Sequence, residues 1–332
     1  MNPAAPGGIG RLHHVGLVVR DMAEAIARYR RLGFHVPPAA FPALPPREGA
    51  PPEPVGAGNT RIRFAHAFVE LAAVLPPGEN GAPDPAAAGP GAAVVPLQAP
   101  PEALPRLAAS MKETSARLAA ALERFEGLHI AVFRTADADA AAARLTAAGV
   151  PHSGVHRLRR PAADGGTVPV GYLEIDGAGG RTPEGRLAIA EDPGGPAAES
   201  AAAHPNGAVD LVEAVLCVPA AELAEAERRY AGYLGRPARP ARPAGPARVF
   251  ALGRSRLVVV GDTGLPEVLP GERPAALPAF VSCAVAVRDI AAARAHLAAA
   301  GVPFTETGAG ELTVPSAEAM GAALVFRERA DT

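Results

Sequence analysis

The chain has 332 residues, 48 % of them hydrophobic, and a formal net charge of −2, a length that corresponds to about two domains. The near-balanced charge argues against the basic surface of a nucleic-acid-binding protein and against polybasic membrane-binding segments, so we expect neither partner. Lys112 is the only lysine, which argues against Walker-type phosphate loops and Schiff-base enzymes, since both depend on a lysine.

Neither the first residues nor the apolar runs indicate targeting to a membrane or for export. Residues 1–10 lack the basic segment and apolar stretch of a secretory signal, and no run approaches the roughly 18 apolar residues of a membrane span. Cys217 and Cys283 lie singly in predicted strands and form no Cys-x-x-Cys pair. We therefore expect a cytoplasmic protein with two buried, reduced thiols.

One segment occurs four times along the chain: an apolar strand, a helix, and a glycine that ends the helix. The copies run over residues 12–33, 127–149, 212–235 and 281–301. Further strands with alternating apolar residues follow them, at 60–73, 167–176, 186–191, 248–260 and 322–327. Each copy therefore begins a module with the order βαβββ, and such internal repeats determine the fold.

The copies are not equally alike, and their similarities indicate how they pair. The second and fourth share the ending Ala-Ala-Gly-Val-Pro at 147–151 and 299–303, and the first and third share an Arg-Tyr near the helix end. We therefore expect two domains, one at 10–195, with modules 11–75 and 126–192, and one at 207–329. The turn at 204–207 joins them.

A helix at about 102–125 does not belong to the repeat. Its apolar residues recur at helical spacing, namely Leu104, Leu107, Met111, Leu118, Leu122 and Phe125. This apolar stripe needs a partner. The first prediction is a connector that packs on the first domain; the alternatives are a homodimer interface and an active-site lid.

The run His14-Val15-Gly16-Leu17-Val18-Val19-Arg20-Asp21 with its following helix resembles the opening of the vicinal oxygen chelate superfamily. That superfamily includes glyoxalase I, bleomycin-resistance proteins, methylmalonyl-CoA epimerase and extradiol dioxygenases. The turn at 204–208 is similar to one in its glyoxalase-like members. The resemblance implies an α+β fold of four βαβββ modules, paired into two tandem glyoxalase-like domains. Each domain is then a cup-shaped mixed sheet with flanking helices.

The resemblance also implies one divalent metal ion, Zn, Fe(II), Mn, Ni or Co, held at the floor of the cup. Its ligands would be a first-strand histidine and a fourth-strand carboxylate from each module, here His14, Glu70, His129 and Glu191. Alternation along the strand places His14, Gly16 and Val18 on one face and His13 on the other. Imidazole and carboxylate groups suit these metals. Glu70 and Glu191 are also the candidate catalytic bases.

Other residues compete for these roles. The second-module carboxylate could instead be Glu199 or Glu174, the latter expected on a solvated face. A histidine in an apolar strand is often only a hydrogen-bond partner of the backbone. We expect His66 at the rim or in the core, and His152, His156 and His204 in loops or at edges. Arg61 and Arg63 differ in parity from Glu70 and are expected to face solvent.

The second domain departs from this pattern. Its first-strand positions hold Glu213 and Ser282, the fourth strand of its first module holds Val258, and Glu328 lies at the very end of the last strand. A histidine-bearing site cannot form there. We expect a structural companion domain, with room for a ligand groove of its own.

The sequence thus favours a divalent-metal-dependent enzyme of the vicinal oxygen chelate type, acting on a small carbonyl or hydroxyl compound. The reaction class stays open between lyase, isomerase and dioxygenase. The alternative is a non-catalytic small-molecule-binding or resistance protein of the same fold. A third reading is an inert scaffold that dimerises through the 102–125 helix.

Overall fold

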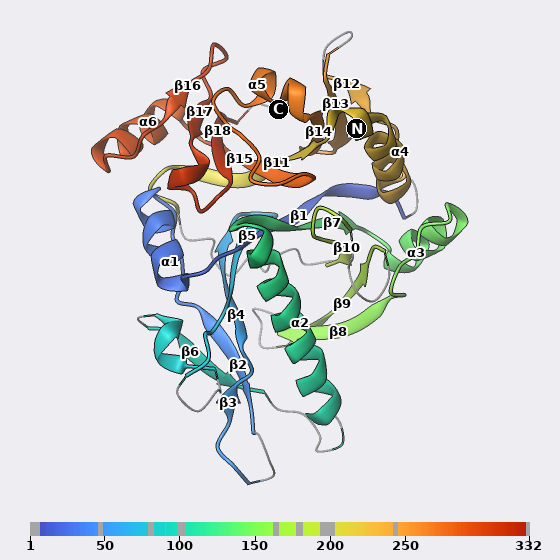
Figure 1. Ribbon diagram of the computed structural model, residues 1–332, viewed down its shortest axis with the longest axis vertical. Coiled ribbons are helices and arrows are strands. Elements are labelled where there is room, and N and C mark those ends of the chain that lie inside the picture. The colour runs from blue at the N-terminus through green and yellow to red at the C-terminus, as the bar shows by residue number, and fades with distance from the viewer. Residues whose placement is uncertain are drawn as a thin grey trace.

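The computed structural model describes residues 7–45, 49–78, 83–89, 91–97, 102, 104–161, 166–176, 182–192, 203–241 and 245–329. The strands form one connected sheet, and its two curved halves, called the first and second sheets below, lie one above the other with helices around them (Figure 1). This is the mixed α+β architecture predicted from the sequence.

The first half of the chain forms one sheet. Its strands are β1 (Ile9–Val18), β2 (Ala40–Leu44), β3 (Glu53–Pro54), β4 (Ala57–Arg63), β5 (Phe68–Val74), β6 (Ala93–Pro96), β7 (Gly127–Thr135), β8 (His156–Pro161), β9 (Thr167–Glu174) and β10 (Arg186–Glu191). Its helices are α1 (Met22–Arg31), α2 (Leu104–Arg124) and α3 (Ala138–Ala147), with a 3-10 turn at Pro85–Ala88.

The second half repeats this plan. Its strands are β11 (Ala208–Val218), β12 (Arg239–Pro240), β13 (Ala247–Leu252), β14 (Ser255–Gly261), β15 (Ala279–Val287), β16 (Thr305–Glu306), β17 (Leu312–Val314) and β18 (Ala323–Glu328). Its helices are α4 (Leu223–Leu234), α5 (Leu265–Val268) and α6 (Ile290–Ala299), with 3-10 turns at Ala220–Glu222, Asp262–Gly264 and Ser316–Glu318. None of the helices described is long and apolar enough to cross a membrane.

Each sheet is built around an antiparallel pair of long strands, β1 with β7 and β11 with β15. Each of these strands has a parallel neighbour on its other side: β5 beside β1, β10 beside β7, β14 beside β11 and β18 beside β15. The remaining strands continue outward by antiparallel pairing, except that β6 pairs with β2 in parallel. The strand pairing therefore joins the first repeat to the second, and the third to the fourth.

The repeated helices start for a common local reason. Asp21, Asp137 and Asp289 have extended backbones, and each accepts a hydrogen bond from a backbone N–H in the first turn of its helix. Such caps satisfy backbone donors that the helix itself leaves unpaired. The helix of the third copy has no such side-chain cap at its start. It ends at Gly235, whose backbone has a φ of +66°, a conformation that glycine adopts without strain.

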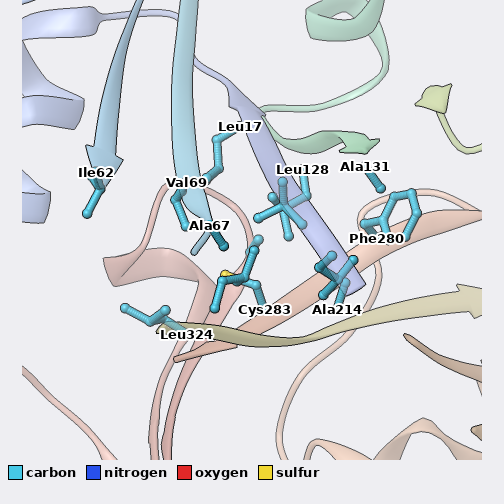
Figure 2. Close-up of a cluster of buried hydrophobic side chains, with 14 of the residues drawn as sticks. Leu17, Ile62, Ala67, Val69, Leu128, Ala131, Ala214, Phe280, Cys283 and Leu324 are labelled. Carbon is cyan, nitrogen blue, oxygen red and sulfur yellow. The ribbon is translucent and has the colours of Figure 1, made fainter. Parts of the chain in front are cut away.

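The main core lies between the two sheets. Figure 2 shows part of it, with Leu17, Val69 and Leu128 of the first sheet facing Ala214, Phe280 and Cys283 of the second. The sheets also join at one bridge, Phe280 to Leu128. Both cysteines are buried and free, and burial raises the pKa of Cys283 to about 12 and that of Cys217 to about 11. The prediction of buried thiols is confirmed.

The turn that connects the two halves is fixed to the first half. His204 is buried between the rings of Phe34 and Phe64; its Nδ1 accepts from the backbone N–H of His35, and its Nε2 donates to the carbonyl of Arg63. His204 thus lies in a loop, as expected, but it is buried there. A sequence pattern of short-range turn residues gives no sign of these long-range partners.

Asn206 completes this connection and is fully buried. Its amide donates to the Leu32 carbonyl at 2.9 Å and accepts from the Ala208 N–H at 3.0 Å. We expect Asn206→Ala to lower the free energy of unfolding by about 1–3 kcal/mol, because two buried backbone groups lose their partners. Urea denaturation measures this.

A matched control is Asn59→Ala, at a half-buried asparagine whose side chain has no hydrogen bond among the described residues. An equal loss in both variants would contradict the role assigned to Asn206.

Candidate functional site

Two β-bulges in the central strand pair decide which side chains reach the cup. In β1, Leu12 pairs with Phe133 and His14 with Val132, so His13 is an extra residue. In β7, Leu128 pairs with Leu17 and Ile130 with Gly16, so His129 is an extra residue. A bulge of this kind shifts the alternation of side chains along its strand.

The bulges also correct the alignment of the first two modules. Each bulge lies eight residues before the N-cap aspartate of the following helix: His13 before Asp21, and His129 before Asp137. His129 therefore corresponds to His13, and the structural counterpart of His14 is Ile130. The prediction that His14 and His129 occupy equivalent positions is wrong by one residue.

His14 and Glu70 lie close together on one face of the first sheet. Glu70 pairs with Gly16, two residues beyond His14, and His14 Nε2 lies 4.0 Å from Glu70 Oε2. Gly16 leaves room for them, since a Cβ there would lie 3.3 Å from Glu70 Oε2 and 2.9 Å from Ile130. The His14 ring also stacks on Phe68, with centroids 4.2 Å apart.

Arg61 is exposed, as expected, but it lies on the same face of the sheet as Glu70. It pairs directly with Glu70 across the antiparallel β4–β5 pair, and directly opposed residues share a face. Its guanidinium lies 5.2 Å from the centre of the Phe68 ring. The sequence did not reveal that Arg61 and Glu70 share a face, because residue parity cannot be carried from one strand to the next without the register.

Glu191 does not lie in the cup. Ala188, which pairs with Val132, holds the position that corresponds to Glu70, and Glu191 follows it on the opposite face. The Glu191 carboxylate accepts from the Ala138 N–H at 2.9 Å, at the start of α3. The prediction that Glu191 lies beside His14 and Glu70 is therefore wrong. Its carboxylate binds the N-terminus of α3.

The two other candidates for this carboxylate do not replace it. Glu174 is not solvated, because its buried carboxylate is ion-paired with Arg117 and Arg186. Glu199 lies outside the described residues. At the positions where ligands were predicted, the second half of the cup presents Ile130 and Ala188, which pack with Leu118 of α2.

His129 is buried next to Ile130. Its Nε2 donates to the Phe125 carbonyl at 2.9 Å, and its ring lies 4.1 Å from the Phe125 ring. Its Nδ1 is buried and has no hydrogen-bond partner in the described part of the chain. Burial lowers the pKa of His129, so the neutral form, with Nδ1 as an acceptor, is favoured.

Sequence reasoning missed a chain of polar contacts through His13. Its Nδ1 lies 2.8 Å from His14 Nδ1, and its Nε2 lies 3.6 Å from a carboxylate oxygen of Asp192, at the end of β10. The four side chains thus run in the order Asp192, His13, His14, Glu70. Aligning the two modules on Asp21 and Asp137 is the signal that could have identified His13.

The environment shifts the pKa values of His14 and Glu70 in opposite directions. Burial, with smaller contributions from His13, Arg61 and Arg186, lowers the pKa of His14 well below its usual value. Burial raises the pKa of Glu70, against the opposing effect of the same arginines. Both shifts favour the neutral form of the side chain, which is the expected effect of removing a charge from water.

Helix α2 lies across the cup, as the connector prediction required, and contacts β1, β4 and β5 (Figure 1). Arg117 binds Glu174 of β9, and the Leu122 carbonyl accepts from Arg20. A cavity of about 540 Å³ lies between α2 and the sheet. Its wall includes Leu118, Ala121, His129, Ile130 and Arg186.

The second sheet has the same register with different residues. By pairing, Glu213 corresponds to His14 and Ser282 to Ile130, as predicted for the second domain. Its fourth-strand positions hold Val258 and Val325, so Glu328 lies three residues beyond the corresponding point. Glu213 is ion-paired with Arg256 and Arg327.

Comparison with known proteins identifies the family. The family model described as a glyoxalase-like domain matches residues 12–234. The chain belongs to the glyoxalase-like domain family. No curated protein shows significant similarity to it.

Solved structures share the fold of this glyoxalase-like protein at low sequence identity. A hypothetical protein from Staphylococcus aureus has 9 % identity and a TM-score of 0.54, with 96 % of this chain and 99 % of that one covered. A mutant of 4-hydroxymandelate synthase from Streptomyces coelicolor has 13 % identity, a TM-score of 0.56 and coverages of 98 % and 94 %. A Mn(II)-bound glyoxalase from Novosphingobium aromaticivorans has 13 % identity, a TM-score of 0.52 and coverages of 98 % and 83 %.

The residues of the cup do not fit the four-ligand metal centre that the resemblance implied. His14 and Glu70 supply two donors, whereas Ile130 and Ala188 have none to offer. Among the described residues, no three or more His, Cys, Asp or Glu side chains are arranged so that they could hold a metal ion. The guanidinium groups of Arg61 and Arg186 act on His14 and Glu70 electrostatically, which further disfavours a second cation there.

The placement of the two glutamates predicts opposite effects of the same substitution. Because the folded-state pKa of Glu70 is raised, its ionisation destabilises the fold as pH rises through that pKa. We expect Glu70→Gln to be more stable than the parent at pH 7.5 and to lose this advantage at pH 4. Thermal denaturation at the two pH values measures it.

Glu191→Gln is the matched variant. It removes a negative charge from the start of α3 and should cost about 0.5 kcal/mol at pH 7.5. Stabilisation by Glu191→Gln, or destabilisation by Glu70→Gln, would contradict the assignment of faces.

Proposed function

We propose that this glyoxalase-like protein binds a small organic molecule in the cavity beneath α2, without a four-ligand metal centre. The observation that carries the proposal is the cavity of about 540 Å³, which His129 lines. The Nδ1 of His129 is buried and has no partner among the described residues. A buried polar atom without a partner is costly and calls for an explanation. A ligand that donates a hydrogen bond to Nδ1 would remove that cost.

The walls indicate the chemistry of this ligand. Val18, Leu118 and Ile130 offer apolar surface, while Arg124 and Arg186 offer guanidinium donors. Neutral His129 donates from Nε2 to Phe125, which leaves Nδ1 as an acceptor. The cavity thus suits an apolar body with a hydroxyl or N–H donor and a carbonyl or acidic oxygen. Its 540 Å³ is within the usual range for small-molecule sites.

Acid–base catalysis on a bound carbonyl compound is the second candidate, favoured by the pair of His14 and Glu70. A neutral imidazole can take a proton, and a carboxylate with a raised pKa is a stronger base than an ordinary carboxylate. Arg186 connects the pair with the cavity, since it lines the cavity and acts electrostatically on both side chains. The reaction class would then be an isomerase or lyase that moves a proton next to a carbonyl.

Filling the cavity tests the binding function. The probe is 8-anilinonaphthalene-1-sulfonate, which combines an apolar body, an N–H donor and anionic oxygens. Ala121 lines the cavity from α2, so Ala121→Phe should weaken binding of the probe at least tenfold by occupying its space. Fluorescence titration gives the dissociation constants.

Ala119→Phe is the matched control, at an exposed position two residues away on the same helix. Equal affinity of the probe for both variants, or no binding by the parent, would exclude the cavity as the binding site. Catalysis can be tested separately from binding. His14→Ala and Glu70→Gln do not change the cavity walls, so they should abolish turnover of a bound carbonyl compound without weakening binding of the probe.

The missing donors can be restored. We expect the parent to retain no stoichiometric metal, and Ile130→His combined with Ala188→Glu to bind Mn(II) or Zn(II), because these substitutions add donors at the two vacant ligand positions. Metal analysis after dialysis measures both. One equivalent of metal in the parent, lost in His14→Ala but not in His129→Ala, would overturn the metal-free proposal.

A further inference from the structure

A second cavity, of about 930 Å³, lies where the two halves of the chain meet. The turn between β4 and β5 forms one wall, and the start of β11 is held to it by the Ala65 N–H, which donates to the Val209 carbonyl. The other walls come from β13 and β14 and from the ends of β15 and β18. The cavity is distinct from the one beneath α2, with which it shares no lining residue.

This cavity is strongly basic. Six arginines line it, against three carboxylates: Arg63, Arg254, Arg256, Arg288, Arg327 and Arg329, with Asp210, Glu311 and Glu328. The whole chain carries a net charge of −2, so the excess of positive charge is local. A concave surface lined mainly by one sign of charge concentrates counter-ions.

Two of the arginines are held by a buried carboxylate. Glu213, 3 % exposed, binds both Arg256 and Arg327, and Arg327 also binds Glu311. Asp210 is bound by Arg11 from the neighbouring sheet at 2.7 Å. These contacts hold the floor of the cavity in place. Two of the three lining carboxylates, Asp210 and Glu311, are therefore already ion-paired.

Three further arginines have no such partner. The side chains of Arg254, Arg288 and Arg329 are exposed and form no ion pair or hydrogen bond with any described residue. They come from three separate places: the β13–β14 turn, the end of β15 and the end of β18. Guanidinium groups gathered in this way repel one another unless an anion lies between them.

We propose that this cavity is a binding site for a small molecule with two or more oxyanion groups, either phosphates or carboxylates. Arginine is well suited to this role, because its planar donors pair with both oxygens of such a group. Arg256 and Arg327 form a fixed floor, and Arg254, Arg288 and Arg329 close on the anion from the rim. The strand ends that carry them are part of rigid sheets, which reduces the entropy lost on binding.

The test uses pyrophosphate and citrate as probes, in isothermal titration calorimetry at 150 mM NaCl. We expect at least one of them to bind with 1:1 stoichiometry, and the preferred probe to identify the ligand as a phosphate or a carboxylate compound. Arg254→Gln with Arg288→Gln should weaken binding at least tenfold. Arg256 and Arg327 are left unchanged, because replacing them would leave the buried Glu213 carboxylate without its ion-pair partners.

Arg228→Gln with Arg273→Gln is the matched control. It removes the same charge at two exposed arginines outside the cavity. Equal weakening by both double variants would show attraction by net charge alone and overturn the proposal, as would failure of both probes to bind the parent. Thermal denaturation confirms that each variant is folded, and Ala121→Phe, which fills only the cavity beneath α2, should leave this binding unchanged.

Discussion

The pairing of β1 with β7, with an extra residue at His13 in β1 and at His129 in β7, is the constraint on which the cup depends. A regular strand alternates its side chains, so one inserted residue exchanges the two faces for everything beyond it. Because His13 and His129 are those insertions, His14 and Ile130 take the matching places on the cup face. The same bulges recur at Val212 and Val281 in the second sheet. The feature therefore belongs to the fold and is not specific to one site.

The repeat was sufficient to predict the architecture because its signals are local. Asp21 and Asp137 cap helices, and alternating apolar residues mark strands, whatever their partners. The site depends on register, which is not local. Arg61 reaches Glu70 only through the β4–β5 pairing, and Glu191 turns away because Ala188 pairs with Val132. The proximity of His14 and Glu70 could be predicted because both lie in the first module, where the positions implied by the resemblance agree with the strand register.

The two sheets place different chemistry in equivalent positions. In the first sheet, burial shifts the pKa values of His14 and Glu70 toward the neutral forms, and both side chains lie next to an apolar wall. In the second, Glu213 stays paired with two arginines, and the rim above it is basic. The shared core between the sheets holds both arrangements rigidly, since close packing resists small displacements. One duplicated scaffold thus offers one cavity suited to a mostly apolar ligand and one suited to an anion.

The covering helix and the absence of metal donors in the second module have a common physical cause. Leu118 of α2 packs on Ile130 and Ala188, and burying such apolar surface contributes roughly 25 cal/mol per Å² to holding the helix over the cup. A histidine and a glutamate at those two positions would place polar groups against Leu118, and unpaired burial of such groups is costly. Apolar packing of α2 and a complete set of metal ligands therefore require different residues at the same two positions. In this chain, both positions hold apolar residues that pack against α2.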